Sequence, residues 1–212
     1  MEITWLGHSC FRIKGKEVTL VADPCDKSIG YSPGKLIANI VTVSHDHAGH
    51  CYLEGIENSP KVLSRPGEYE VGGVFITGIG TFHDQERGKS RGKNTSYLIE
   101  IEDIRLCHLG DLGHVPSPRQ IEDLGSIDVL FVPVGGVSTI DAKIAAEIVR
   151  LINPKIIIPM HYRTQEVTWL EPLDKFIKEM GLREVVPQPK LSVTRLGLPL
   201  ETQVIVLDYR IS

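Results

Sequence analysis

Three of the chain's eight histidines, His45, His47 and His50, fall within six residues. They directly follow the apolar stretch from Ile40 to Val43, which predicts a buried strand. If extended backbone continues past that strand, His45 and His47 point to one face and Asp46 to the other, because strand side chains alternate. A turn after His47 would then return His50 to their side. Neutral imidazoles that converge to within about 2.0–2.1 Å of one point are what zinc and similar divalent metals require, so the spacing favours a metal site over three solvated loop histidines.

Further candidate ligands come soon after other predicted strands. His83 and Asp111 each follow a β-rich segment, and His161 follows a buried apolar one. Each of the three is compatible with a structural role when it is considered alone. Side chains at the ends of several strands lie close together, however, when these strands end at one cleft, as at the carboxyl edge of α/β sheets. We therefore expect all six side chains to face the same cleft.

The elements that must position these side chains follow from the hydrophobic pattern. Short β-rich segments punctuated by Gly, Pro and Asn are typical of sheets. The segment from Asp141 to Ile152 instead carries apolar residues at helical spacing between two buried strands, which should therefore be parallel. Ser138 with Asp141 resembles a capping box at the start of this helix. The expected strands are Ile3 to Trp5, Phe11 to Ile13, Val18 to Ala22, Ile40 to Val43, Val74 to Ile79, Ser96 to Ile101, Ile104 to Leu109, Ile127 to Pro133, Lys155 to Pro159, Glu184 to Val186 and Val204 to Tyr209, with a second helix over Leu170 to Met180.

Composition limits the class of protein. The chain has 212 residues, 42% of them hydrophobic and 24% charged, and a formal net charge of −4, so we expect one folded domain over residues 1–212 with no bulk attraction to nucleic acid or anionic membranes. Met1 is followed by Glu2, and the apolar runs are short, so neither a signal peptide nor a spanning helix is expected. The four cysteines form no Cys-x-x-Cys pair, which favours reduced thiols and a cytoplasmic location. We expect a small-molecule partner and leave a homo-oligomer open.

Several segments together carry a resemblance to a known family. They are Leu6-Gly7-His8-Ser9-Cys10-Phe11, Val21-Ala22-Asp23-Pro24, the histidine cluster, Arg91-Gly92-Lys93-Asn94, His108-Leu109-Gly110-Asp111, Pro133-Val134-Gly135-Gly136 and Pro159-Met160-His161-Tyr162. With them the chain resembles the metallo-β-lactamase fold superfamily, and within it the bacterial group of predicted zinc-dependent hydrolases similar to L-ascorbate-6-phosphate lactonase. The resemblance implies an α+β fold, a four-layer αββα sandwich with a metal cleft along one edge.

The resemblance also implies a ligand set for two metal positions. The first metal position would be held by His45, His47 and His83, and the second by His50, Asp111 and His161, with Asp111 bridging the two. Asp23 matches an aspartate that orients the ligands from behind, and His8 and His108 are expected to support the site. The implied cofactor is Zn2+, or Mn2+, Ni2+ or Fe.

One residue departs from the family pattern. The family's cluster is His-x-His-x-Asp-His, and the aspartate position is occupied here by Gly49. That aspartate normally ligates the second metal, and Asp46 is a poor substitute because alternation points it away. We therefore expect one tightly bound ion and a second position that is weak or empty.

The leading hypothesis is a metal-dependent hydrolase. A bound divalent ion can lower the pKa of water from about 15.7 to near 7 and so supply hydroxide for attack on a carbonyl or phosphoryl centre. Asp111 would accept or orient the proton, and His161 or Tyr162 would steady the developing oxyanion. The basic segment from Arg87 to Asn94 is expected to be an exposed, mobile loop, and Arg87, Arg91, Asn94 and Tyr162 are the candidate substrate contacts.

Several alternatives remain open. Taken alone, the basic segment favours an ordinary solvated loop over a phosphate-binding one, so a small phosphorylated lactone, ester or phosphodiester is a hypothesis for the substrate class. A nuclease of the same fold that processes RNA is the second hypothesis, although the net negative charge argues against it. The third is a metal- or ligand-binding protein whose catalysis is impaired because Gly49 replaces the aspartate. His114 is expected to be a surface residue.

Overall fold

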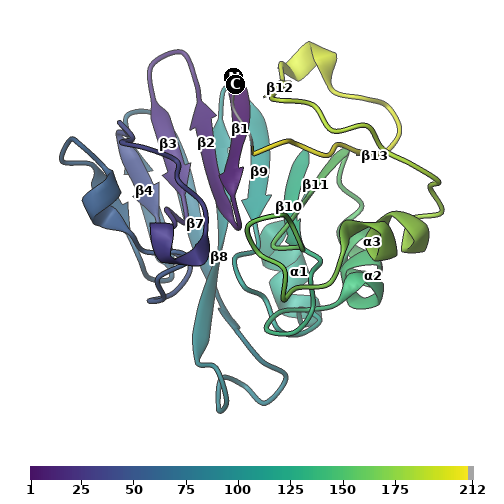
Figure 1. Ribbon diagram of the computed structural model, residues 1–212. Coiled ribbons are helices and arrows are strands. Elements are labelled where there is room, and N and C mark those ends of the chain that lie inside the picture. The colour runs from purple at the N-terminus through teal and green to yellow at the C-terminus, as the bar shows by residue number, and fades with distance from the viewer. Residues whose placement is uncertain (210–212) are drawn as a thin grey trace.

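The computed structural model describes residues 1–209 and contains two mixed β-sheets that share a core (Figure 1). The first sheet has the strand order β12-β1-β2-β3-β4-β5 and the second β13-β11-β10-β9-β8-β7-β6. The strands of the first sheet are β1 Glu2–Gly7, β2 Cys10–Lys14, β3 Thr19–Ala22, β4 Ile40–Thr42, β5 Lys61–Leu63 and β12 Leu191–Ser192. Those of the second are β6 Gly67–Val71, β7 Val74–Phe82, β8 Lys93–Ile101, β9 Ile104–His108, β10 Val129–Pro133, β11 Ile156–Met160 and β13 Gln203–Val204.

Helices cover the second sheet. The α-helices are α1 Pro118–Leu124, α2 Ala142–Ile152 and α3 Leu173–Glu179. The buried residues of α2 recur at helical spacing and belong to the main core, so burial of this apolar face holds α2 against the sheet. Among the described residues, none of the helices is long and apolar enough to cross a bilayer.

The outer face of the first sheet is covered differently. A second apolar cluster joins Val21 and Val41 of that sheet to Tyr31, Leu36 and Ile56 of the connecting segments. These connections contain only the short 3-10 turns Lys27–Ile29 and Leu53–Gly55. The α+β sandwich is therefore confirmed, but loops and 3-10 turns replace α-helices in its fourth layer.

Two hydrogen bonds from one tyrosine join the sheets beside the histidine cluster. The hydroxyl of Tyr97 on β8 donates to the carbonyl of Val43, at 3.0 Å, and to that of Leu63, at 2.9 Å. The backbone N–H of Thr95 donates to the carbonyl of Ser44 at 2.8 Å. The ends of β4 and β5 are thereby fixed to β8, so ligands from different sheets can be held in one constant arrangement.

The strand–helix–strand unit is confirmed, because β10 and β11 pair in parallel from Val129 and Ile156 onward. The predicted cap of its helix is wrong: the side chain of Asp141, and not of Ser138, accepts the N–H of Ile144. The capping box belongs to α1, which the hydrophobic pattern did not predict, and it is formed by Ser117 and Gln120.

The C-terminal strands are less regular than expected. No strand forms over residues 184–186, and the predicted strand from Val204 to Tyr209 is reduced to β13, Gln203–Val204, and an isolated bridge at Leu207. Val186 is exposed, so its β propensity has no packing partner to support it. The helix predicted from Leu170 begins only at Leu173, after Pro172.

Candidate metal centre

A turn after β4 brings the three clustered histidines together. The N–H groups of His50 and Cys51 donate to the carbonyl of His47 at 2.8 and 3.1 Å, which folds the chain back as predicted. Asp46 is exposed and accepts a hydrogen bond from the Cys51 thiol at 3.3 Å. Asp46 thus lies away from the histidine rings and does not take the place of the missing motif aspartate.

Four imidazoles surround one carboxylate oxygen. The Oδ2 atom of Asp111 lies 3.2 Å from Nε2 of His50, 3.2 Å from Nε2 of His83 and 3.3 Å from Nε2 of His161. It lies 4.0 Å from Nε2 of His45. Asp111, His83 and His161 each follow the strand from which they were expected, and the histidine turn approaches from the other sheet. Five of the six side chains that were expected to converge thus lie together, and His47, which is exposed, lies beside His45 and His50.

The possible ligand atoms fall into three overlapping groups whose members lie within 4.8 Å of one another. Neither implied ligand trio forms a group of its own, because His47 is grouped with His45 and His50 and not with His83, and Asp111 is grouped with His45 and His83. One member was not expected as a ligand, namely His8. The groups are His45, His47 and His50; His45, His83 and Asp111; and His8, His50 and His161.

The donor set fits a metal ion. Among the described residues, Nε2 of His45, of His50 and of His83 is buried and forms no hydrogen bond of good geometry, although the last two lie 3.2 Å from Asp111 Oδ2. Buried polar atoms are almost always hydrogen-bonded, so three orphaned nitrogens around one carboxylate need an explanation. Coordination of a divalent ion would satisfy them, and imidazole with carboxylate is a common donor set for zinc.

Hydrogen bonds behind the cluster fix which nitrogen of each ring faces the cleft. Asp23 is fully buried, and its Oδ2 lies 2.8 Å from Nδ1 of His50 and 2.6 Å from the Ser44 hydroxyl. That hydroxyl in turn lies 3.0 Å from Nδ1 of His45. With Nδ1 engaged, Nε2 of His50 and of His45 is directed at Asp111. Asp23 therefore has the orienting geometry that was expected of it.

Asp111 is itself held by neighbouring strands. Its N–H donates to Oδ1 of Asn94 at 3.0 Å, and its Oδ1 accepts from the Ser9 hydroxyl at 3.5 Å. Gly110 has a φ of 59°, and a Cβ there would lie 2.5 Å from Asn94 Oδ1 and from Ser44 Cβ. Both the left-handed backbone and the close approach require glycine at this position.

His108 lies beneath the site as expected. Its Nδ1 accepts the N–H of Gly110 at 3.2 Å, so Nε2 carries the proton and donates to the carbonyl of Ser9 at 2.9 Å. Burial lowers the pKa of His108, which keeps it neutral in this role. His108 thus joins the β1–β2 turn to the strand end that carries Asp111.

In the metal-free protein, the pKa values of neighbouring groups are shifted in opposite directions. Burial, together with the charge of His50, lowers the pKa of His45 to about 4. Burial also opposes protonation of His50, but the carboxylates of Asp111 and Asp23 outweigh it and raise the pKa of His50 to about 10. Burial favours the neutral form of Asp111, yet His161 and His50 hold the pKa of its carboxyl well below its usual range. A metal must therefore displace a proton from His50 when it binds.

Comparison with known proteins adds the family. The model of the β-lactamase superfamily domain matches residues 2–161. The chain belongs to the metallo-β-lactamase superfamily. A solved structure from Thermotoga maritima, assigned as a Zn-dependent hydrolase of this superfamily, is 42% identical, covers 97% of each chain and gives a TM-score of 0.81. A UPF0173 protein of Pyrococcus abyssi is 32% identical over 77% of this chain and 84% of its own length, and a UPF0173 metal-dependent hydrolase of Thermococcus onnurineus is 28% identical over 85% and 92%.

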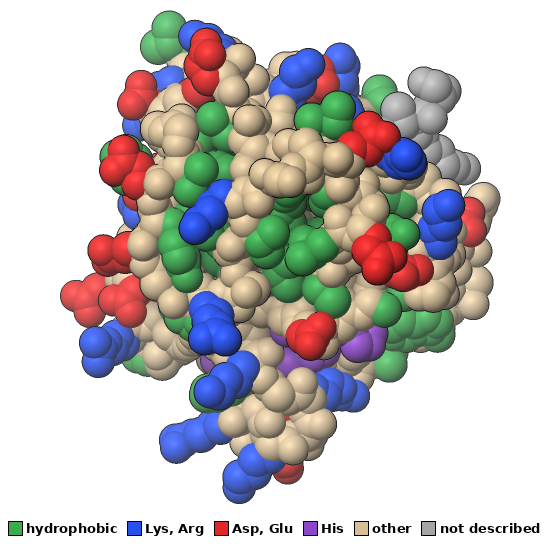
Figure 2. Space-filling view, turned by 90° about the vertical axis from the view of Figure 1, so that its left-hand side faces the viewer, with side chains coloured by type: hydrophobic (Ala, Val, Ile, Leu, Met, Phe, Trp, Pro, Cys, Tyr) green, Lys and Arg blue, Asp and Glu red, His purple; other side chains and the backbone are tan. Residues whose placement is uncertain are grey.

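The basic loop expected to bind substrate projects from this superfamily domain between β7 and β8 (Figure 1). Figure 2 shows Lys and Arg side chains on this projecting part of the surface, directly below exposed histidine surface. Arg87 and Arg91 are both exposed, and Nη2 of Arg91 donates to the carbonyl of Val137 at 3.0 Å. Arg91 thereby joins the basic loop to the connection between β10 and α2.

One carboxylate organises the backbone of the basic loop. Asp84 accepts four backbone N–H groups, those of Glu86, Gly88, Ser90 and Arg91, at 2.7–2.9 Å. These bonds, led by that from Arg91, lower the pKa of Asp84 to about 2. The sequence offered only a weak signal for this, an aspartate at the start of a loop rich in glycine and serine.

Two expected substrate contacts are engaged elsewhere. The amide of Asn94 is buried and donates to Thr81 Oγ1 at 2.7 Å and to the carbonyl of Leu109 at 2.9 Å, while its oxygen holds Asp111. Tyr162 is buried, with its ring centroid 5.1 Å from that of Trp5. The geometry favours a positioning role for Asn94 and a packing role for Tyr162.

Other residues of the site were not expected from the sequence. Ser9 and Ser44 contact Asp111 and Asp23, and both stand beside residues already singled out, since Ser9 follows His8 and Ser44 precedes His45. His114 is half-buried, and its Nε2 accepts the N–H of Phe82 at 3.2 Å, so it is more than a surface residue although it belongs to none of the ligand groups.

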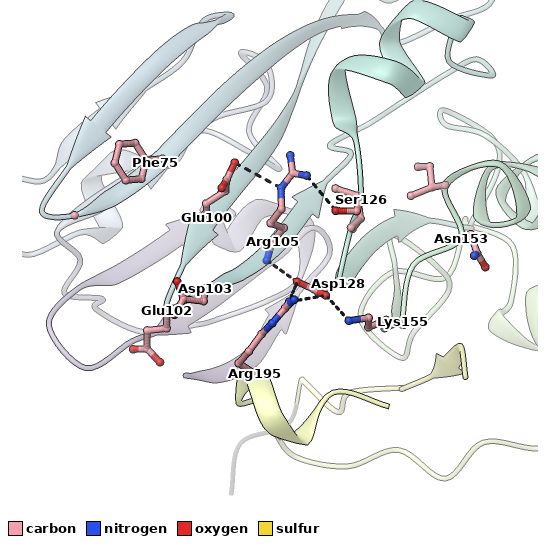
Figure 3. A pocket seen from close by; sticks show the side chains of 13 residues that line it. Phe75, Glu100, Glu102, Asp103, Arg105, Ser126, Asp128, Asn153, Lys155 and Arg195 are labelled. Atoms are coloured by element: carbon pink, nitrogen blue, oxygen red, sulfur yellow. Dashed lines mark hydrogen bonds and ion pairs between the residues drawn. The ribbon is translucent and has the colours of Figure 1, made fainter. Parts of the chain in front are cut away.

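A second concentration of charge lies at the opposite ends of the same strands (Figure 3). Asp128 precedes β10 and accepts from the backbone N–H of Arg105 at 3.0 Å, from Lys155 Nζ at 3.1 Å and from Arg195 Nη1 at 3.1 Å. Arg105 is also paired with Glu100 at 3.5 Å. In this polar pocket, positive and negative groups neutralise one another.

Proposed function

We propose that this protein is a metal-dependent hydrolase of small anionic substrates and that its reaction takes place at the Asp111 cluster. One observation carries the proposal: a single carboxylate oxygen is approached by Nε2 atoms from four histidines, and three of those nitrogens are buried without a hydrogen-bond partner. The names of the superfamily relatives support metal dependence and hydrolysis, but they specify no substrate.

The chemistry requires a bound divalent ion, for which we propose zinc. When bound, such an ion polarises the electrophile and lowers the pKa of water at the site from about 15.7 to near 7. The residues that would hold metal at the two positions are His45, His47, His50, His83, Asp111 and His161. Asp23 and Ser44 keep the imidazoles of His50 and His45 turned inward.

Asp111 is the group best placed to hold or accept a proton. It is buried, and its Oδ1 is contacted by Ser9 while Oδ2 faces the histidines. Asn94 fixes its backbone. This double constraint keeps the carboxylate in one orientation, as efficient proton transfer requires.

For substrate class we propose a small phosphorylated lactone, ester or phosphodiester. The supporting observation is the basic loop, in which Asp84 accepts four backbone N–H groups and the side chain of Arg87 is exposed and has no partner among the described residues. Arginine is suited to phosphate because its fork of donors matches two oxygens. If Arg87→Ala reduces turnover of phosphorylated and unphosphorylated analogues equally, this part of the proposal is wrong.

A small-molecule substrate is preferred to RNA, and a cytoplasmic location is part of the same proposal. The net charge of −4 opposes accumulation on a phosphate backbone. A gel-shift experiment with structured RNA at low salt tests this choice, since tight binding would favour the nuclease hypothesis.

The central test is metal content followed by activity. We expect purified protein to retain zinc after gel filtration, and the double variant His45→Ala, His47→Ala to lose it together with hydrolysis of an ester, lactone and phosphodiester panel. His114→Ala is the matched control, because this histidine is near the cleft but outside every ligand group. Full zinc retention in the double variant would refute the proposal.

A further inference from the structure

The space that the missing motif aspartate would occupy is filled by another residue. A Cβ added to Gly49 would lie 3.0 Å from Cδ2 and 3.1 Å from Nε2 of His8. Such contacts are tighter than nine in ten real Cβ contacts, so the His8 ring would have to move by a few tenths of an ångström to admit a side chain at position 49. The His8 ring therefore lies directly against the position from which the side chain of a motif aspartate would start.

The backbone gives no reason for glycine at position 49. Gly49 is not among the residues with positive φ, so its conformation is open to any L-amino acid. The neighbouring cluster contains glycines that do need a left-handed backbone, such as Gly110 with a φ of 59°. The tightest contacts of a Cβ at position 49 would be those with the ring of His8, whereas His47 Nδ1 would lie at an ordinary 3.7 Å.

His8 is held in an unfavourable backbone conformation, with its ring beside those of His161 and His50. Its φ is 52°, an uncommon value for a residue with a side chain. Its carbonyl accepts the indole N–H of Trp5 at 2.9 Å and the backbone N–H of His161 at 3.1 Å. These bonds fix the β1–β2 turn against the end of β11 and keep the strained backbone in place.

The ring of His8 packs against two expected ligands of the second metal position. Its centroid lies 4.1 Å from that of His161 and 5.2 Å from that of His50. His8 is only 3% exposed, and its Nδ1 is buried without a hydrogen-bond partner among the described residues. Ring nitrogens of His8, His50 and His161 also lie within 4.8 Å of one another. An unpartnered, buried imidazole beside two ligands has the properties of a third.

We propose that His8 replaces the motif aspartate as a ligand of the second metal position, which is then completed by His50, His161 and Asp111. This inference rests on the proposed metal centre. It changes the expected stoichiometry, since three imidazoles and one carboxylate form a full four-coordinate set. The second ion is bound and not weak or absent.

The experiment is a zinc titration of the metal-free protein with equivalents counted by elemental analysis. We expect two equivalents for the wild type and for His114→Ala, and one for His8→Ala, with the second affinity reduced by at least about 100-fold. The double variant His8→Ala, Gly49→Asp should recover the second equivalent, because a carboxylate can enter the vacated volume. Circular dichroism of each metal-free variant checks that it is folded.

A measurement on the unmutated protein makes the test independent of folding in the variants. In 15N-histidine-labelled protein, the ring signals of His8 should shift with the second zinc equivalent and not with the first. Two equivalents retained by His8→Ala with unchanged affinity, unshifted His8 signals, or a single equivalent in the wild type would each overturn the assignment of His8 while leaving the hydrolase proposal intact. A wild type that binds no zinc would refute the proposed metal centre itself.

Discussion

The two ends of strands β9, β10 and β11 carry opposite kinds of polar cluster. At the carboxyl ends, Asp111 and His161 meet imidazoles whose nitrogens have no hydrogen-bond partner. At the amino ends, Asp128 is paired with Lys155 and Arg195 and accepts a backbone N–H (Figure 3). Both regions are rich in titratable groups, but unsatisfied side-chain atoms gather among the histidines, whereas in the polar pocket only Arg105 Nε among the described atoms lacks a hydrogen bond, and it lies 3.5 Å from Glu100 Oε1.

The difference separates a site that binds from a cluster that stabilises. Satisfied charges lower the free energy of the folded chain and have little left to offer a ligand. Unsatisfied buried nitrogens cost stability in the metal-free protein and recover it when a metal binds. Changes at the carboxyl ends should therefore alter metal affinity, whereas changes at the amino ends should alter stability.

The largest effect is expected for loss of His45 and His47. The double alanine variant should lose more than about 100-fold in zinc affinity, which exceeds the usual cost of changing a residue behind a ligand. Its metal-free form should unfold at nearly the same denaturant concentration as the metal-free wild type, because Nε2 of His45 is buried without a hydrogen-bond partner and His47 is exposed. Equilibrium dialysis and urea unfolding measure the two quantities. A large loss of stability in the metal-free double variant would contradict the proposed difference between this site and the cluster around Asp128.

Asp23→Asn should have the next effect. The variant keeps the size of the side chain but loses the carboxylate that faces His50 Nδ1 and Ser44. We expect a 10–100-fold loss of zinc affinity, the range found for residues that orient metal-bound histidines. Competition with a chromogenic chelator gives the affinity, and Asp46→Asn, which changes an exposed aspartate of the same turn, is the control. Equal affinities in Asp23→Asn and wild type would show that the orienting bonds are not needed.

Asp128→Ala should have the opposite effect, a loss of stability in place of a loss of zinc affinity. Its partners Lys155 and Arg195 are 41% and 55% exposed, so solvent screens the lost pairs, and we expect about 1–3 kcal/mol of destabilisation, mainly from the unpaired N–H of Arg105. Zinc affinity should not change. Urea unfolding with parallel zinc titration checks both expectations, and loss of zinc binding in this variant would mean that the two strand ends are not independent.

The smallest effect concerns Glu102, also at the polar pocket. Burial favours its neutral form, but the backbone N–H of Lys16 at 2.6 Å and the N-terminal amine at 3.0 Å outweigh this and lower the pKa of the carboxyl. Because the folded pKa is depressed, the stabilisation is present above the unfolded pKa of about 4.5 and is lost as the pH falls through the folded value. Glu102→Gln should cost roughly 0.5–1 kcal/mol at pH 7 and less at pH 3. A difference in stability that grows on acidification would contradict this sign.

The sequence predicted the parts of this arrangement that depend on local patterns. Apolar runs followed by polar turns located the strand ends, and histidine spacing with the family resemblance located His45, His83, Asp111 and His161. It could not predict that His8 lies over Gly49, because contact between residues 41 positions apart depends on how two turns pack. For a similar reason, the sequence suggested Asn94 as a substrate contact and not as the residue that holds Asp111. That positioning role depends on β8 lying beside β9, which a motif does not reveal.

Anomalous diffraction at the zinc edge from crystals grown with zinc tests the central claim most directly. The account predicts peaks beside Asp111 Oδ2, one facing His45 and His83 and one facing His8, His50 and His161, with no peak in the polar pocket around Asp128. Zinc bound at Asp128, or no anomalous peak at the histidines, would contradict it.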